Sequence, residues 1–441
     1  SGAQVLESWR AASEAAEHMM TTNPQLASGA TLKAWANWRF GKTKLLRGED
    51  AKQPLETALE SAQAAIKLSP NDWQAIYFYS LVLSTLADLP GSPADVRTKL
   101  QSQSSTALRR TIELNPNSTW AWHDLGHRLL STLEDKILHG AFDEALVTEV
   151  ESCFMKAAQS DPKHYPSQMG LLSMYSDKVL FQYNHGQSIE RDTALALEAE
   201  KQALSLNKSD SFIHALGFTV RMYHAEYLSW SAEVPAQILD QLSKKLSLLQ
   251  AAEAAEGVED VYAPHISVLR AANDLHAGRD PRPAIAEGLG AILQIRKKEP
   301  SLVSLFTAEA ALHLLAGRFA GVHSAEAQQH WQRAVTAAQQ AVALGPDEAD
   351  AHARLCESLR YAASVTASQP RRAADKSEHA HPVSERGVKA CAAALAINPT
   401  LAVAYANRGA LLTQQAQWET NPTLRGSLAH SAQESIEQAL A

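Results

Sequence analysis

The sequence lacks features that several large protein classes require. It has only 3 cysteines among 441 residues, and Cys153, Cys356 and Cys391 are too widely spaced for a disulfide framework or a metal knuckle. We therefore expect buried thiols and a reducing compartment, the cytoplasm. No run of 18 apolar residues is present, which excludes a membrane-spanning helix. A formal net charge of −8, without clustered Lys or Arg, excludes a nucleic-acid partner.

Catalytic and cofactor motifs are missing as well. The sequence contains no Walker loop, no nucleophile elbow and no His-Glu-x-x-His pair, so we expect neither catalysis nor a cofactor. The nearest approach to a metal site is His123 and His127, one helical turn apart, but the sequence indicates no third ligand and we expect no metal. Ser1 and Gly2 are typical of the remnant of an expression tag, which indicates a piece of a longer protein.

An internal repeat is the strongest feature that the sequence does have. Ala-rich stretches that end in Leu or Ile are followed by a stop, and successive stops such as Pro70 and Pro116 are 46 residues apart. The stops fall at Pro24, Pro70, Pro116, Pro162, Lys208, Pro300, Pro346 and Pro399. Self-similarity at such a period is the signature of stacked repeats, in which neighbours complete each other's core. We therefore expect a single solenoid over residues 1–441.

Each repeat predicts two antiparallel helices. Asp72 is placed to cap the first helix of one repeat, residues 89–91 end that helix, and the second helix runs to the stop at Pro116. The same pattern along the chain predicts an all-α fold of about nine helix pairs, preceded by a leading helix over residues 4–22. The last interval is longer than the others, and we expect residues 366–386 to form an exposed loop insertion.

The positions of small residues point to a known kind of repeat. In the second helices they recur seven apart, as at Ala58 and Ala65, which puts them on one stripe and lets the next helix approach closely. In this respect the chain resembles the tetratricopeptide repeat (TPR) family. The family's pattern is met by Trp122, Leu125, Gly126 and Leu129, and by Tyr405, Leu411, Ala432 and Ala439. The resemblance implies an open right-handed superhelix, with taller hairpins than in the family's 34-residue repeats.

The last repeat, residues 383–441, carries a narrower resemblance. With the Ala-Leu-Ala-Ile-Asn-Pro that ends at Pro399, it looks like the repeat region found carboxy-terminal to the catalytic domain of bacterial serine/threonine protein kinases. This resemblance implies a regulatory or sensor region in signalling. The chain itself has no His-Arg-Asp and no Asp-Phe-Gly, so a catalytic domain would lie outside it.

The TPR resemblance also implies a binding surface. In that family the first helices line the concave face, through residues four, seven, eight and eleven after each stop. Carried onto this chain, with the offset one shorter after Lys208, these positions are Gln74, Tyr77, Phe78, Trp120, His123, Asp124, His127, His214, Phe218, Asp350, Arg354, Glu357 and Asn407. Rings beside hydrogen-bonding groups suit a peptide groove, although rings such as Tyr77 and Phe218 could instead fill the core between repeats. We expect a non-catalytic protein–protein interaction scaffold with a protein or peptide partner.

Two other classes of function stay open. An enzyme on a helical toroid would also use antiparallel helix hairpins, but a toroid must close on itself and hold a carboxylate pair in an aromatic funnel. A self-association module would stack its end helices on another copy, because the end of a solenoid leaves an apolar face uncovered. Scattering in solution separates the first alternative from an elongated solenoid, and the oligomeric state tests the second.

Overall fold

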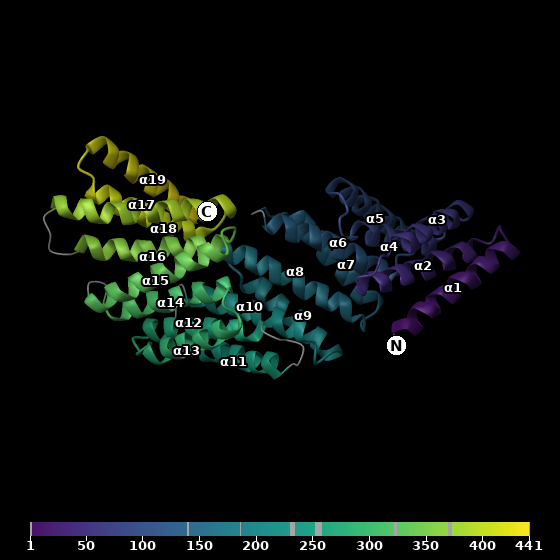
Figure 1. Cartoon of the computed structure of the whole chain (residues 1–441), viewed down its shortest axis with the longest axis horizontal. Coiled ribbons are helices and arrows are strands. Elements are labelled where there is room, and N and C mark those ends of the chain that lie inside the picture. The colour runs from purple at the N-terminus through teal and green to yellow at the C-terminus, as the bar shows by residue number, and fades with distance from the viewer. Residues whose placement is uncertain are drawn as a thin grey trace. The chain divides into compact units, whose positions relative to one another are not determined.

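The computed structural model describes residues 2–138, 141–185, 187–229, 234–251, 258–321, 324–368 and 373–440. Within these ranges the regular secondary structure consists of 19 α-helices and no strand (Figure 1). This confirms the predicted all-α class and the predicted leading helix followed by nine pairs. The chain divides into two compact units, where the sequence predicts one solenoid. The continuity of the repeats as an open right-handed superhelix stays a prediction.

Unit 1 comprises Ser1–Leu133 and Asp143–Leu171, and unit 2 comprises Glu134–Phe142 and Leu172–Ala441. The helices that lie within unit 1 are α1 (Gly2–Thr22), α2 (Ala27–Leu46), α3 (Lys52–Leu68), α4 (Trp73–Ala87), α5 (Ala94–Leu114) and α7 (Glu144–Ser160). Two helices contribute to both units: α6 (Thr119–Leu138) and α8 (Tyr165–Asn184).

The remaining helices belong to unit 2. They are α9 (Glu190–Leu206), α10 (Ser211–Ser229), α11 (Ala236–Ala251), α12 (Val258–His276), α13 (Arg282–Lys298), α14 (Val303–Phe319), α15 (Ala325–Leu344), α16 (Ala349–Ser368), α17 (Ala373–Ile397), α18 (Ala402–Trp418) and α19 (Pro422–Leu440).

Local turn chemistry sets where these helices begin and end. Asp72 caps α4 as predicted, because its carboxylate accepts hydrogen bonds from the backbone N–H groups of Gln74 at 3.0 Å and Ala75 at 3.4 Å. The helices α3, α5 and α15 each end two residues before a predicted proline stop, at Leu68, Leu114 and Leu344. The proline-based division of the chain into helix pairs is therefore confirmed at these positions.

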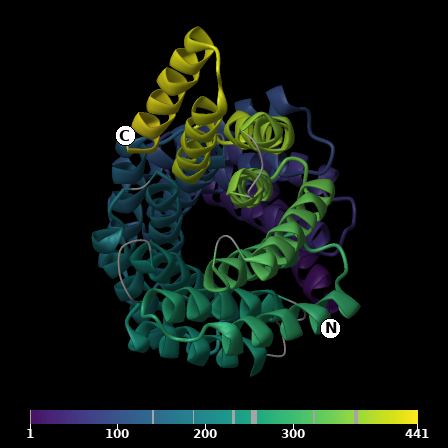
Figure 2. The same cartoon turned by 90° about the vertical axis from the view of Figure 1, so that its left-hand side faces the viewer.

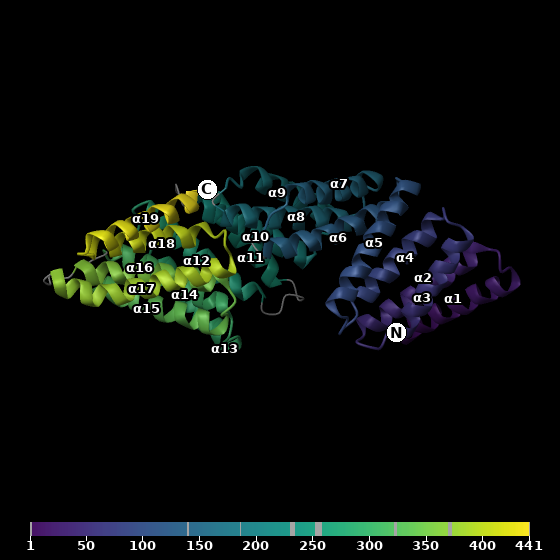
Figure 3. The same ribbon diagram turned by 90° about the horizontal axis from the view of Figure 1, so that it is seen from above.

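In unit 1, consecutive helices pack side by side from α1 to α5, and α2 also contacts α4 (Figure 3). Farther along the unit, the ring of Phe154 on α7 is fully buried. Gly126 and Gly170 lie against that ring, and a Cβ atom on either glycine would come within about 3.0 Å of it or closer. The small residue that the repeat pattern places on α6 thus allows the close helix contact that the sequence predicts.

In unit 2, the first helix of each pair contacts the first helix of the next, in the order α10, α12, α14, α16 and α18. Each also packs on its own second helix, as α14 does on α15 and α16 on α17. In Figure 2 the teal to yellow helices of this unit follow a curved path. The first helices therefore form one continuous layer, which is the arrangement that positions the candidate site.

Cys356 on α16 and Cys391 on α17 form a disulfide, with their Cα atoms 5.2 Å apart. The expectation of three free thiols is therefore wrong for this pair. Spacing along the chain missed it because α16 and α17 are antiparallel and closely packed, which brings together two residues separated by 35 positions. Cys153 is a buried free thiol. The cysteine-based argument for a reducing compartment no longer holds, and a cytoplasmic location stays a prediction.

The predicted loop insertion at 366–386 is largely helical where the structure describes it. Residues 366–368 complete α16, and residues 373–386 form the first part of α17. Residues 369–372, and the exposure of the side chains up to residue 381, lie outside what the structure describes. None of the described helices combines the length and the apolar character that crossing a membrane requires.

Candidate functional site

The candidate site is a cavity of about 200 Å³ in unit 2, which we call the inner cavity. Its walls come from α8, α10, α12, α14, α16 and the start of α18, which are all first helices of their pairs. The titratable residues that line it are Tyr183, Tyr223, Glu226, His265, Asp350 and Arg354. Helices that are far apart in the sequence thus bring aromatic, acidic and basic groups to one place.

Two tyrosines and a glutamate form one side of the inner cavity. The rings of Tyr183 and Tyr223 lie with their centroids 5.1 Å apart and their planes tilted by 42°. Tyr183 is hydrogen-bonded to Glu226 through their side chains. Burial, followed by the charge of Glu226, raises the pKa of Tyr183 well above its usual value, and burial raises the pKa of Tyr223 as well, so both rings carry neutral hydroxyl groups at neutral pH.

Arg354 on α16 is the one Lys or Arg among the described residues that line the inner cavity. It forms an ion pair with Glu357, one turn farther along the same helix. It also interacts electrostatically with Glu226 on α10 and with Asp350 on its own helix. One guanidinium is therefore shared by three carboxylates.

Burial shifts the titration of the other groups in the inner cavity. Water reaches Asp350, yet the concave walls surround it, so desolvation raises its pKa. The pKa of Glu226 is raised for the same reason, although the hydrogen bond from Tyr183 and the charge of Arg354 oppose the shift. Burial and then Arg354 lower the pKa of His265 to about 4, so this imidazole is neutral at pH 7.

Two predicted residues, Asp350 and Arg354, lie where the TPR resemblance puts them, on the wall of the inner cavity. Glu357 lies beside them and is half-buried in its ion pair with Arg354. The structure thus brings together the three predicted residues of α16. Their role in binding a partner stays a prediction.

The sequence analysis missed Tyr183, Tyr223, Glu226 and His265. The rule taken from the TPR family covers positions up to eleven residues after each stop, whereas Tyr223 and Glu226 lie 15 and 18 residues after Lys208. Because the helices of this chain are longer than those of the family, the inner face continues for further turns. If the count starts at Lys208 without the shortened offset and continues along α10 in steps of three or four residues, it reaches Tyr223 and Glu226.

The shortened offset after Lys208 is also why His214 and Phe218 were misplaced. Phe218 is fully buried, in a core cluster with Met222 and Leu242, so its ring has no surface to offer a partner. The ring of His214 is nearly buried, and its two nitrogens lie 3.0 Å from the carbonyl oxygen of Lys208 and 3.0 Å from Lys245 Nζ. Both residues lie one helical step away from the residues that line the inner cavity. We therefore correct their predicted role from partner binding to a structural one.

Asn407 is a further correction. It is nearly buried, and its side-chain amide donates a hydrogen bond to the carbonyl oxygen of Val403, 3.0 Å away on the same helix. The position four residues after Pro399, Val403, is instead the one that lines the inner cavity. The side chain of Asn407 thus helps to hold the first turns of α18 rather than facing a partner.

In unit 1, the predicted residues are largely bonded to one another. The hydroxyl of Tyr77 on α4 donates a hydrogen bond of 2.7 Å to Asp124 Oδ2 on α6. Burial raises the pKa of Asp124 to about 6, partly offset by this hydrogen bond and by the charges of Arg128 and Lys42. Phe78 is half-buried, with its ring centroid 5.7 Å from that of Tyr77, whereas Gln74 is exposed.

A histidine cluster lies next to this pair. His123 is 8% exposed, and its ring centroid is 5.1 Å from that of His164, 6.3 Å from that of His127 and 6.0 Å from that of Trp120. Burial, and then the neighbouring histidines, lower the pKa of His123 to about 3. The ring of Trp120 is 53% exposed. Among the described residues, no three His, Cys, Asp or Glu side chains are grouped so that they could hold a metal ion.

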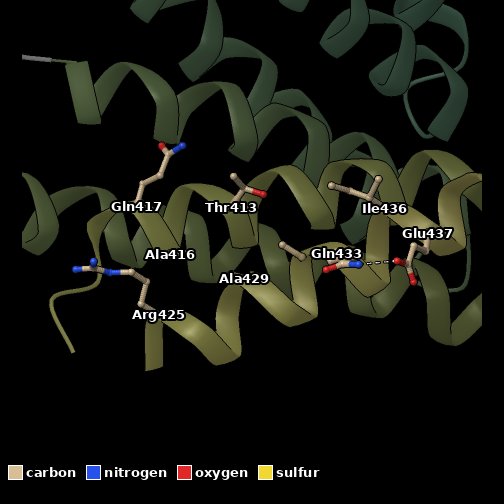
Figure 4. Close-up of a pocket in the computed structure, with 9 residues that line it drawn as sticks. Thr413, Ala416, Gln417, Arg425, Ala429, Gln433, Ile436 and Glu437 are labelled. Carbon is tan, nitrogen blue, oxygen red and sulfur yellow. Dashed lines mark hydrogen bonds between the residues drawn. The ribbon is translucent and has the colours of Figure 1, made fainter. Parts of the chain in front are cut away.

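A larger cavity, of about 720 Å³, lies between α18 and α19 (Figure 4). Thr413 and Gln417 line it from α18, and Ala429, Gln433 and Ile436 line it from α19. The Ile436 side chain is 43% exposed there. Small and apolar side chains contribute much of these walls, as they do between stacked repeats, and we call this feature the end groove.

The comparisons with known proteins return helical neighbours at low similarity. No family model and no curated protein matches the sequence. Among solved structures, yeast Tom70 matches with 10% identity over 98% of this chain and 96% of that chain, at a TM-score of 0.42. The TPR domain of P58(IPK) matches with 15% identity over 92% and 99%, at a TM-score of 0.23. Human IFIT1, whose structure contains PPP-AAAA, matches with 14% identity over 93% and 90%, at a TM-score of 0.35.

These TM-scores are too low to support an argument about the fold. The evidence for a TPR-like arrangement is the helix pairs of the structure. Repeated antiparallel pairs, with each first helix of unit 2 packed on the next, form a TPR-like helical repeat. The link to kinases and the exclusion of a nucleic-acid partner both stay predictions.

Proposed function

We propose that this chain is a non-catalytic scaffold that binds a polypeptide through the first helices of unit 2, with the inner cavity as the central contact. Helical repeats commonly present such concave surfaces to their partners. In this proposal the partner lies across the exposed side chains around the cavity in an extended conformation and places one side chain inside it. The cavity volume, about 200 Å³, suits a single side chain rather than a helix.

One observation carries this proposal: six first helices meet at a water-accessible cavity lined by tyrosines and charged groups. Tyrosine combines a large apolar ring with a hydroxyl that fixes register, which is why it is enriched where proteins bind each other. A side chain that entered the cavity would contact Tyr183, Tyr223 and Asp350 together. In unit 1 the acid Asp124 is half-buried and bonded to Tyr77, whereas in unit 2 Asp350 is exposed at the cavity, so unit 2 is the better candidate for partner binding.

A selection with a phage-displayed random dodecapeptide library tests the proposal. The bait is the whole chain, compared with a Val403→Trp variant. Val403 is 46% exposed in the first turn of α18 and lines the inner cavity, so tryptophan can block the cavity without entering the core. We expect peptides selected on the wild-type chain to lose at least about tenfold in affinity for the variant.

Val96→Trp is the matched control. Val96 is 42% exposed, in the first turn of α5 in unit 1, and does not line the inner cavity. The same peptides should bind this control as tightly as they bind the wild-type chain. Equal loss in both variants, or recovery of no peptide on the wild-type chain, would contradict the proposal.

The other functional predictions call for different measurements. A toroidal enzyme would turn over a glycoside with Glu226 and Asp350, whereas the scaffold turns over none. Self-association through the end groove predicts a concentration-dependent dimer in light scattering that Ile436→Glu abolishes, because Ile436 is an exposed apolar residue on its wall. The kinase connection, which rests on residues 383–441, predicts a catalytic domain on the same polypeptide in the encoding gene.

A further inference from the structure

The inner cavity carries more acidic than basic charge. Glu226 and Asp350 line it and Glu357 lies beside it, whereas Arg354 is the one Lys or Arg in its described lining. The single positive charge of Arg354 is shared by these three carboxylates. His265 does not change this balance at pH 7, because it is neutral there. A second positive charge entering the cavity would therefore meet a net negative charge.

The two acids of the cavity differ in how they are held. Glu226 accepts a hydrogen bond from Tyr183, which fixes its carboxylate against the tyrosine pair. Asp350 is reached by water, at the first turn of α16. Burial disfavours the charged form of both carboxylates. An incoming cation would favour the charged form and would therefore lower both pKa values.

The tyrosine pair adds a second reason for a cation. The rings of Tyr183 and Tyr223 are adjacent, 5.1 Å between centroids, and both contribute to the lining. An aromatic face attracts a cation through its quadrupole, and a planar guanidinium both stacks on the ring and bonds a carboxylate with two N–H groups. Lysine offers a compact charge without this planar match.

We propose that the inner cavity binds the guanidinium group of an arginine side chain in the partner polypeptide, with Glu226 and Asp350 as its acceptors and Tyr183 and Tyr223 as its aromatic wall. This inference rests on the proposed function and specifies the residue that the scaffold recognises. The binding step is a charge-assisted contact without covalent chemistry, and it weakens as ionic strength rises.

The test uses the peptides selected on the whole wild-type chain. Arginine should be enriched at one position, and replacing it by citrulline, which is neutral and nearly isosteric, should weaken binding at least about tenfold. Replacing it by lysine should weaken binding less. This comparison changes only the peptide, so it does not depend on how any protein variant folds. Free spermidine is a competitor that tests whether a small polyamine, rather than a peptide, is the preferred cation.

The protein variants are Glu226→Gln and Asp350→Asn, each of which removes a charge and keeps side-chain volume. Each should weaken the arginine peptide at least about fivefold and leave the citrulline peptide unchanged. The control is Glu434→Gln on α19, a carboxylate with 61% of its side chain exposed and far in sequence from the cavity lining. It should change neither affinity.

Several outcomes would overturn the inference while leaving peptide binding in place. These are selected peptides without a basic residue, equal affinity of the arginine and citrulline peptides, or equal effects of Glu434→Gln and Asp350→Asn. Spermidine binding more tightly than every arginine peptide would also overturn it. If the wild-type chain selects no peptide at all, the proposed function fails and this inference fails with it.

Discussion

The inner faces of the two units are both built from first helices, and in each a tyrosine bonds a carboxylate on another first helix, but unit 2 adds an exposed acid, Asp350, on the wall of a cavity. In unit 1, Tyr77 and Asp124 bond to each other across neighbouring helices, and His123 is nearly buried among aromatic rings. In unit 2, Glu226 and Asp350 line a cavity that water reaches. An acid on a first helix can therefore bond a neighbouring first helix or stand exposed at a cavity that water reaches.

The largest difference between the units should appear when a buried core residue behind the inner face of unit 1 is truncated. Phe154→Ala takes away a fully buried ring that packs against Gly126, Gly170 and the His123 ring. We expect it to lower the free energy of unfolding of unit 1 by about 3–5 kcal/mol. Repeats are stabilised mainly by their neighbours, so hydrogen exchange should accelerate in α6 to α8 much more than in α14 to α18.

Phe212→Ala is the matched control for that substitution. The Phe212 ring on α10 is 51% exposed, so its loss should cost less than about 1 kcal/mol. Equal acceleration of exchange throughout both units after Phe154→Ala would show that the chain unfolds as one cooperative body. The two inner faces would then differ in their chemistry, but the two units would not differ in stability.

A pair of hydroxyl deletions compares the two faces directly. Tyr77→Phe removes the donor to Asp124 and leaves a largely enclosed carboxylate without that bond, which should cost about 1–2 kcal/mol of stability. Tyr183→Phe removes the donor to Glu226, which is half-buried as Asp124 is, so we expect a similar cost of about 1–2 kcal/mol. Chemical denaturation measures both stabilities.

Peptide binding, unlike stability, should separate the two variants. Tyr183→Phe should weaken the arginine peptide, because Glu226 loses the bond that orients it, whereas Tyr77→Phe should leave its affinity unchanged. If Tyr77→Phe weakened peptide binding as much as Tyr183→Phe, the division into a structural face and a binding face would be wrong.

Much of the fold follows from the sequence because it depends on local signals. Asp72 and the proline stops fix helix ends through the few residues around them, and the structure confirms them. Asp350 and Arg354 were identified through the TPR resemblance, whose rule counts residues along the first helix from each proline stop. These parts of the structure require no knowledge of how distant helices approach one another.

The rest of the site depends on long-range geometry that no local pattern encodes. Tyr183 meets Glu226 and Arg354 because α8, α10 and α16 converge, and this convergence is the sum of small rotations from repeat to repeat. The Cys356–Cys391 disulfide was missed for a related reason, since it reflects the packing of two helices rather than cysteine spacing. One error, at His214 and Phe218, came from shifting the helical phase by a single residue.

The stability of unit 1 should depend on pH through two titrations of opposite sign. His123, with its pKa lowered to about 3, binds fewer protons when folded than when unfolded, so it makes stability rise with pH between about 3 and 6.5. Asp124, with its pKa raised to about 6, binds more protons when folded, so it makes stability fall with pH between about 3.8 and 6. The two slopes should largely cancel in the wild-type chain.

Asp124→Asn removes one of these titrations and keeps an acceptor for the Tyr77 hydroxyl. Between pH 4.5 and pH 6, the free energy of unfolding of the variant should rise by about 1 kcal/mol more than that of the wild-type chain, because the titration of His123 is no longer opposed. Hydrogen exchange of α6 at both pH values measures this gain, and the His123 imidazole signals in NMR report its pKa directly. A His123 pKa near 6.5 would contradict the burial that distinguishes this face from the inner cavity.

The smallest effect is expected at Trp120, an exposed ring of the histidine cluster in unit 1. Replacing all three predicted residues Trp120, His123 and Asp124 together would disturb the fold, because His123 is nearly buried and Asp124 is bonded to Tyr77. Trp120→Ala alone removes a ring that is 53% exposed and touches His164 edge-on, so it should cost less than about 1 kcal/mol. Fluorescence polarisation with the arginine peptide should give an unchanged affinity. A loss of about tenfold or more, with helicity intact, would move the partner-binding face to unit 1 and reverse the comparison between the units.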